Sequence, residues 1–160
     1  MWQAGFHMTC KLGIGNRFKD MSDDPVSQRL DVGAMRRAAK LFLGKHDFKS
    51  FEGTRDYEVE SRVRTLTRCD VKRNGPLLTF IIEGDGFLYK MCRGIVGTLV
   101  QVGQRKFAAE DIKLMLARKD RRVAGMTAPP HGLVLWKVYY GKVPRANAQS
   151  TQKFQGPNAK

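Results

Sequence analysis

The 160-residue sequence lacks any long apolar run. A helix that crosses a bilayer needs about 20 consecutive apolar residues, and no stretch approaches that length. The N-terminus also lacks the uninterrupted apolar segment of a signal peptide. We therefore expect a cytoplasmic protein without a membrane-spanning segment.

Cysteine and histidine are also scarce, with three of each in the chain. The cysteines are odd in number without a CxxC pair, and the histidines are scattered: Cys10, Cys69, Cys92, His7, His46 and His131. This spacing argues against a zinc site, and we expect no metal. Cys69 in a strand and Cys92 in a helix are most simply small, buried, reduced core residues, so we expect no disulfide.

Acidic residues are few: 15 Asp and Glu stand against 29 Lys and Arg, a net charge of +14. Such an excess favours a polyanionic partner, either nucleic acid or an anionic membrane surface, and charge alone does not choose between them. With 42% hydrophobic residues, the chain can still bury a core. The composition predicts one compact domain, or one domain plus a tail.

The pattern divides the chain into three parts. Residues 1–30 show neither helical nor alternating periodicity, and MSDDP at 21–25 indicates a loop, so we expect an irregular segment, a remnant or a non-native stretch. Residues 31–143 carry the periodic elements. Residues 144–160 have almost no core-forming side chains and predict a disordered basic tail.

The domain begins with a helix of about twelve residues, with Asp31 as N-cap and Gly44 as the stop. We expect residues 46–61 to form a mobile, partly extended connection. A β-hairpin follows, with strands at 62–72 and 77–83 joined at residues 73–75. Helices at 87–102 and 108–119, a loop at 121–132 and a closing strand at 133–140 complete the order.

In the first hairpin strand, alternation predicts one core face and one basic face. The core face would carry Val63, Thr65, Thr67, Cys69 and Val71, and the basic face Arg62, Arg64, Leu66, Arg68, Asp70 and Lys72. The basic face has two interpretations, an ordinary solvated surface or a track for phosphates.

This order of elements predicts an α+β fold: a largely antiparallel sheet with helices on one face and the other face open to a ligand. We expect the basic strand to lie on that open face near Arg93. Arg93 lies off the apolar stripe of the helix at 87–102 and shares a side with Lys90 and Gly97. With glycines at 94 and 97 beside it, something could approach closely.

Two roles are open for Arg93 on these grounds. One is a surface salt bridge. The other is a fixed cation that holds a catalytic carboxylate or a phosphate, because the guanidinium fork suits both.

The segments GDGFLYKMCRGIVGTLVQVGQRK and LARKDRRVAGMTAPPHGLVLWKVYY, with GKHDFKSF before them, resemble the C-terminal half of the TruA-type tRNA pseudouridine synthases over roughly residues 31–140. The resemblance implies a pseudouridine synthase-like fold and the isomerisation of uridine to pseudouridine in tRNA, without a cofactor. It also implies that Arg93 pairs with the catalytic aspartate, that Leu133 lines the uracil pocket, and that the enzyme is a homodimer. The residues expected to bind the tRNA are Arg62, Arg64, Arg68, Lys72 and Lys90.

The family's catalytic aspartate lies in an N-terminal half, in a segment that reads approximately GRTDxGVHA. None of the ten aspartates of this chain has that context. We therefore expect an isolated or truncated C-terminal domain that is inactive alone and that pairs with a separate N-terminal catalytic half. The alternatives are a stand-alone RNA-binding module without catalysis and a structural or dimerising module.

Overall fold

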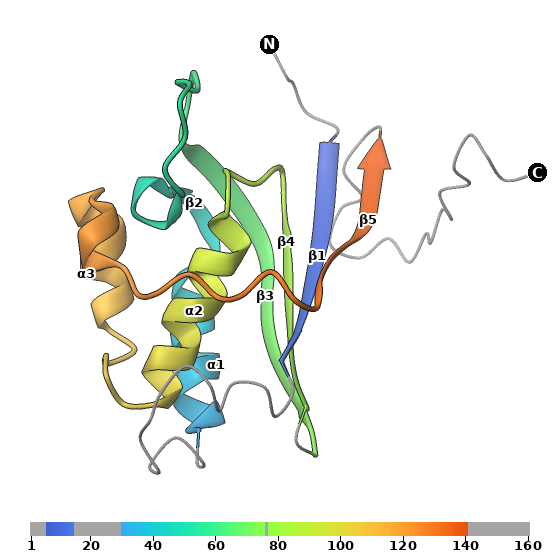
Figure 1. Cartoon of the computed structure of the whole chain (residues 1–160), viewed down its shortest axis with the longest axis vertical. Coiled ribbons are helices and arrows are strands. Elements are labelled where there is room, and N and C mark those ends of the chain that lie inside the picture. The colour runs from blue at the N-terminus through green and yellow to red at the C-terminus, as the bar shows by residue number, and fades with distance from the viewer. Residues whose placement is uncertain (1–5, 15–29, 76, 141–160) are drawn as a thin grey trace, which may run out of the picture.

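An antiparallel sheet forms the centre of the protein in a computed structural model that describes residues 6–14, 30–75 and 77–140 (Figure 1). Its strands are β1 (Phe6–Ile14), β2 (Gly44–Asp47), β3 (Val63–Asn74), β4 (Leu77–Gly84) and β5 (Leu133–Tyr140). The helices are α1 (Val32–Leu41), α2 (Met91–Gly103) and α3 (Asp111–Arg118), with short 3-10 turns η3 (Lys49–Phe51) and η4 (Arg121–Val123). The predicted α+β class is confirmed.

Strand β1 corrects the sequence analysis, which expected no regular structure before residue 30. The sheet order is β2-β3-β4-β1-β5, so β1 lies between β4 and β5 and pairs antiparallel with both. Its side chains alternate as a strand between two environments requires, because Cys10 and Leu12 belong to the buried core while Thr9 bonds to Glu83 on the opposite face. The loop predicted at 21–25 and the tail at 144–160 lie outside the described residues.

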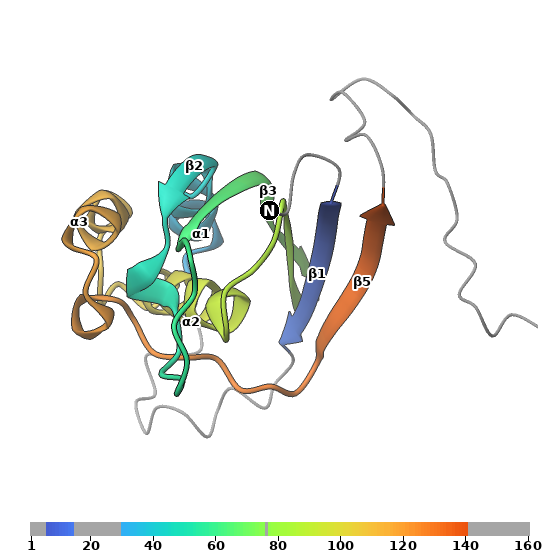
Figure 2. The ribbon, with the colours of Figure 1, turned by 90° about the horizontal axis from the view of Figure 1, so that it is seen from above.

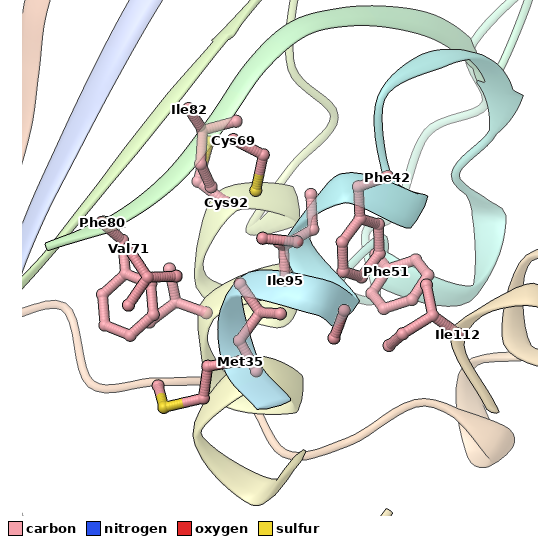
Figure 3. Packing of buried hydrophobic residues seen from close by; sticks show 14 of the residues in the cluster. Met35, Phe42, Phe51, Cys69, Val71, Phe80, Ile82, Cys92, Ile95 and Ile112 are labelled. Atoms are coloured by element: carbon pink, nitrogen blue, oxygen red, sulfur yellow. The ribbon is translucent and has the colours of Figure 1, made fainter. Parts of the chain in front are cut away.

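All three helices lie on the same side of the sheet, and they cover β3 and β4 rather than β5 (Figures 1 and 2). Helix α1 begins where predicted, because the Asp31 side chain accepts a hydrogen bond of 2.9 Å from the backbone N–H of Ala34. Figure 3 shows the resulting core, in which strand side chains face helix side chains: Cys69, Val71, Phe80, Ile82, Met35, Phe42, Cys92 and Ile95. Cys69 and Cys92 are buried, as predicted.

The segment expected to be a mobile connection, 46–61, begins with ordered structure instead. Strand β2 pairs with the start of β3, and η3 follows it. Phe48 and Phe51 are fully buried, and both ring centroids lie within 6.4 Å of that of Phe42. Burial of aromatic rings on this scale is among the largest single contributions to a small core.

A β-bulge in β3 also contradicts the predicted division into a core face and a basic face. Leu66 pairs with Gly84 and Arg68 with the next residue, Glu83, so Thr67 is an extra residue on β3. An extra residue moves the side chains on either side of it to opposite faces. Leu66 is therefore buried together with Cys69 and Val71, rather than lying on a basic face.

Helix α2 is buried along most of its length and begins later than predicted, at Met91. None of the helices in the described part of the chain is long and apolar enough to cross a membrane.

Candidate active site

Arg93 lies in the first turn of α2, on the helix-covered side of the sheet, and is half-buried. Its Nε donates a hydrogen bond of 2.7 Å to the backbone carbonyl of Ala128. Among the described residues, the two terminal guanidinium nitrogens make no hydrogen bond or ion pair. The side chain is thus anchored at Nε, while the nitrogens that form a bidentate fork are unengaged.

Gly94 and Gly97, beside Arg93, do not leave room for a ligand, as the sequence analysis expected, but for other parts of this chain. A Cβ at Gly97 would overlap the carbonyl oxygen of Met126, and a Cβ at Gly94 would lie 2.8 Å from the carbonyl oxygen of Phe51. The close approach is therefore made by this chain's own loop and by η3, not by an incoming ligand. Both glycines are required for packing around α2.

The loop between η4 and β5 connects the Arg93 anchor to Leu133. Ala128 donates its backbone N–H to the carbonyl of Arg93 at 2.9 Å, and the Leu133 N–H donates to the carbonyl of Pro130. Leu133 pairs with Leu12 and packs against the core, so it lies on the same side of the sheet as Arg93. Further along β5 no helix covers that side, and Leu135, opposite Cys10, is 51% exposed.

The five predicted RNA-binding cations do not form one surface. Arg64 and Arg62 share the helix side with Leu66, because they precede it by two and four positions in extended chain. Arg68 and Lys72 follow the bulge and lie on the open face, where Arg68 is paired with Asp70. The expectation that this strand face lies beside Arg93 is therefore wrong, and the RNA-binding roles stay predictions.

A cluster of aromatic and charged side chains lies just before α2, the helix that carries Arg93, and was missed at the level of sequence. The Arg55 guanidinium lies 4.8 Å from the Tyr57 ring centroid and 5.0 Å from that of Tyr89. Lys90, the N-cap residue of α2, places its Nζ 5.1 Å from the Tyr89 ring centroid. Only the aromatic residues of RDY and FLY hinted at this cluster, because the two segments are far apart in the sequence.

The buried thiols of Cys69 and Cys92 offer no reactive group at the site. Burial raises the pKa of the Cys69 thiol to about 12, and hydrogen bonding to Cys10 together with burial raises the pKa of Cys92. Thiols of this kind are poor nucleophiles near neutral pH because the thiolate is the reactive form. The chemistry available here is therefore that of the Arg93 guanidinium.

Comparison with known proteins agrees with this assembly of features. A profile of the tRNA pseudouridine synthase family matches residues 38–141, which is more than half of the chain. The chain belongs to this family.

Similar proteins named tRNA pseudouridine synthase A occur in several bacteria. That of Geobacillus kaustophilus is 51% identical over 111 residues, covering 69% of this chain and 43% of the relative. That of Exiguobacterium sp. is 50% identical over 118 residues, covering 74% and 48%, and that of Bacillus subtilis is 48% identical over 114 residues, covering 71% and 46%. The chain spans about half the length of these curated relatives.

Proposed function

We propose that this chain provides the arginine-bearing half of a tRNA pseudouridine synthase and forms pseudouridine only together with a half that carries the catalytic aspartate. One observation carries the proposal: Arg93 is held at Nε by Ala128, and its two terminal nitrogens have no partner among the described residues. Because these nitrogens have no partner among the described residues, the half-buried guanidinium can form a bidentate ion pair with a carboxylate from the other half.

The expected role of Arg93 is to position and ionise that carboxylate. A bidentate pair fixes the orientation of both planar groups, and the nearby positive charge favours the ionised form of the acid. Lysine has the charge without the fork and cannot reproduce the geometry. Leu133, on the same side of the sheet, would supply an apolar wall for the uracil base.

The second half would have an available surface beside β5. Within the described part of the chain, β5 has a neighbouring strand on one side only, and its Leu135 is half exposed on the helix side. An unpaired strand edge next to exposed apolar side chains is a typical site for strand addition. The proposed complex would act on tRNA in the cytosol.

The homodimer implied by the resemblance is part of the same proposal. The surface that it would use is the sheet face away from the helices, where Val134 and Trp136 are each about half exposed. Analytical ultracentrifugation of the reconstituted enzyme would test this, and a monomer at micromolar concentration would contradict it.

The test of the function is reconstitution. The N-terminal half of the Geobacillus kaustophilus relative would be supplied as a separate chain or as a fusion, with tRNA labelled with tritium at C5 of uridine. Formation of a carbon–carbon glycosidic bond at C5 releases that hydrogen, so tritium release measures the reaction. We expect release only when both halves are present.

Three outcomes would contradict parts of this proposal. Release by the 160-residue chain alone would show that it carries its own carboxylate, and substitution of Asp20, Asp23 or Asp24, which lie outside the described residues, would identify it. Failure of every combination, with both halves folded, would contradict the enzymatic role. Tight tRNA binding without release would favour the stand-alone RNA-binding module.

A further inference from the structure

The side chains around Arg55 form a preorganised aromatic surface, which we call the tyrosine platform and define as Arg55, Tyr57 and Tyr89. Arg55 contacts both rings and donates a hydrogen bond of 3.0 Å from Nη1 to the Tyr57 hydroxyl. Its side chain is only 14% exposed, whereas Tyr57 is 65% and Tyr89 44% exposed. The cation is thus covered and the rings are presented to solvent.

The platform is tied to the rest of the fold by a buried acid. The Glu52 carboxylate lies 3.4 Å from Arg55 Nε and 2.7 Å from Arg62 Nε, with its side chain 7% exposed. The contact with Arg62 is a hydrogen bond, whereas the contact with Arg55 is an ion pair in which neither Arg55 Nε nor Glu52 Oε1 makes a hydrogen bond to a described residue. Arg55 thus pairs with Glu52 through Nε and contacts the two rings with its guanidinium group.

The platform is also connected directly to the start of α2. The Gly53 N–H donates a hydrogen bond of 2.8 Å to the carbonyl of Tyr89, and the stem of Lys90 packs over Gly53. Lys90 is the N-cap residue of α2, in a left-handed backbone conformation, and its side chain is exposed three positions before Arg93. The two rings and this solvent-exposed cation thus lead into the turn of α2 that carries Arg93.

We propose that the tyrosine platform stacks an unpaired base of the RNA next to the target uridine, with Lys90 contacting the adjoining phosphate. This inference rests on the proposed function and names its RNA-binding element. Exposed aromatic rings beside cations are the means by which proteins hold single-stranded RNA, because every base has a face that can stack. A purely structural cluster would instead cover its rings.

The platform is tested with the 160-residue chain and a uridine-rich RNA decamer that contains one 2-aminopurine, whose fluorescence falls when it stacks. Wild-type protein should quench the probe. Tyr57→Ala and Tyr89→Ala should each weaken binding roughly 5- to 100-fold, which corresponds to the usual contribution of one stacked base. Tyr89→Phe, which retains the ring, should stay within about twofold of wild type.

A matched control is available on β5. Trp136 is 53% exposed and lies under Lys11, whose Nζ is 3.7 Å from the ring centroid, so it is another exposed aromatic residue beside a lysine. Because Trp136 also lies on the proposed dimer surface, the comparison is made at a protein concentration at which ultracentrifugation shows a monomer, and Trp136→Ala should then leave affinity and quenching unchanged. Lys90→Gln should lower the slope of log affinity against log salt by about 0.7, whereas the tyrosine variants should retain the wild-type slope. Urea midpoints would confirm that all variants are folded.

The results separate this inference from the proposed function. Normal binding by both tyrosine variants, equal losses for Trp136→Ala, or no binding by the wild-type chain would each overturn the platform, whether or not the reconstituted enzyme releases tritium. Loss of binding in the tyrosine variants alone would support the platform even if reconstitution failed. If Tyr89→Ala instead prevented association with the N-terminal half while RNA binding was normal, the platform would be a protein contact and the inference would be wrong.

Discussion

Arg93 and Ala128 hold each other by two hydrogen bonds, one from the Arg93 Nε to the Ala128 carbonyl and one from the Ala128 N–H to the Arg93 carbonyl. The side chain of an arginine and the loop that leads to Leu133 are thereby fixed together. Because Nε is the only guanidinium nitrogen with a partner among the residues that the structure describes, the group has a defined direction and an open fork. Arg93→Ala should then reduce the free energy of unfolding by only about 1 kcal/mol, the usual net contribution of one hydrogen bond. Urea unfolding measures this loss, and a variant that failed to fold would show that Arg93 is a structural residue.

Gly97 and Gly33 should respond in opposite directions to the same substitution. Gly97→Ala places a methyl group onto the Met126 carbonyl, where backbone must move, so we expect a loss of about 2–4 kcal/mol or failure to fold. Gly33 lies in the exposed first turn of α1, where a Cβ meets only side-chain atoms at 3.3 Å and 3.6 Å. Gly33→Ala should be neutral or stabilising by up to about 1 kcal/mol. Urea unfolding of the two variants measures the difference, and similar midpoints would contradict the packing of the loop on α2.

The sequence predicted the secondary-structure elements better than the tertiary contacts between them. The Asp31 cap, the hairpin and the limits of β5 follow from local signals, and they are confirmed. The role of Gly97 depends on its contact with a loop that is distant in the sequence. A local sequence pattern does not indicate which distant residues pack against a glycine. Helical periodicity singled out Arg93 as a cation off the apolar stripe, whereas its carboxylate partner and the role of Leu133 came from the family motif.

Two errors in the sequence analysis have physical causes. Strand β1 has nine residues, but both of its partner strands are distant in the sequence, so no neighbouring hairpin strand marked its alternation as that of a strand. The bulge at Thr67 reversed the faces of β3, and its only trace in the sequence is a change of phase in the alternation, visible as Leu66 among the cations of the predicted basic face. The platform was missed because its two tyrosines meet only in the folded protein.

The separation of the β3 cations onto two faces predicts unequal effects on tRNA binding. Lys72 is exposed on the open face, away from Arg93, so Lys72→Gln should leave the affinity for tRNA within about twofold. Lys90→Gln should weaken binding and reduce its salt dependence, because Lys90 lies beside the candidate site. Filter binding over a salt series provides both quantities. If the two substitutions changed the affinity and its salt dependence equally, Lys72 and Lys90 would both contact the RNA backbone, and the separation of the cations onto two faces would not matter for binding.

The buried Cys69 thiol should make stability depend on pH in the alkaline range. Its pKa is raised to about 12 by burial, while the same thiol in the unfolded chain has a pKa of about 8.5. The unfolded state therefore loses a proton that the folded state retains, and the free energy of unfolding falls between about pH 8.5 and 12, by up to about 1.4 kcal/mol per pH unit.

Cys69→Ala removes that titration. We expect this variant to be less stable at pH 7, because a buried group is lost, but to lose stability less steeply than wild type between about pH 8.5 and 10.5. Urea midpoints at several pH values give the two slopes. Parallel slopes would mean that the thiol ionises equally easily in both states.

The central claim is that Arg93 contributes a guanidinium fork, not only a charge, to an active site completed by another half. Tritium release by the reconstituted enzyme with wild-type, Arg93→Lys and Arg93→Ala chains tests it most directly. With both variants folded and bound to the N-terminal half, we predict that each loses activity by about 100-fold or more, as expected when a positioned ionic contact is removed. Retention of a third or more of the wild-type rate by Arg93→Lys would contradict the claim.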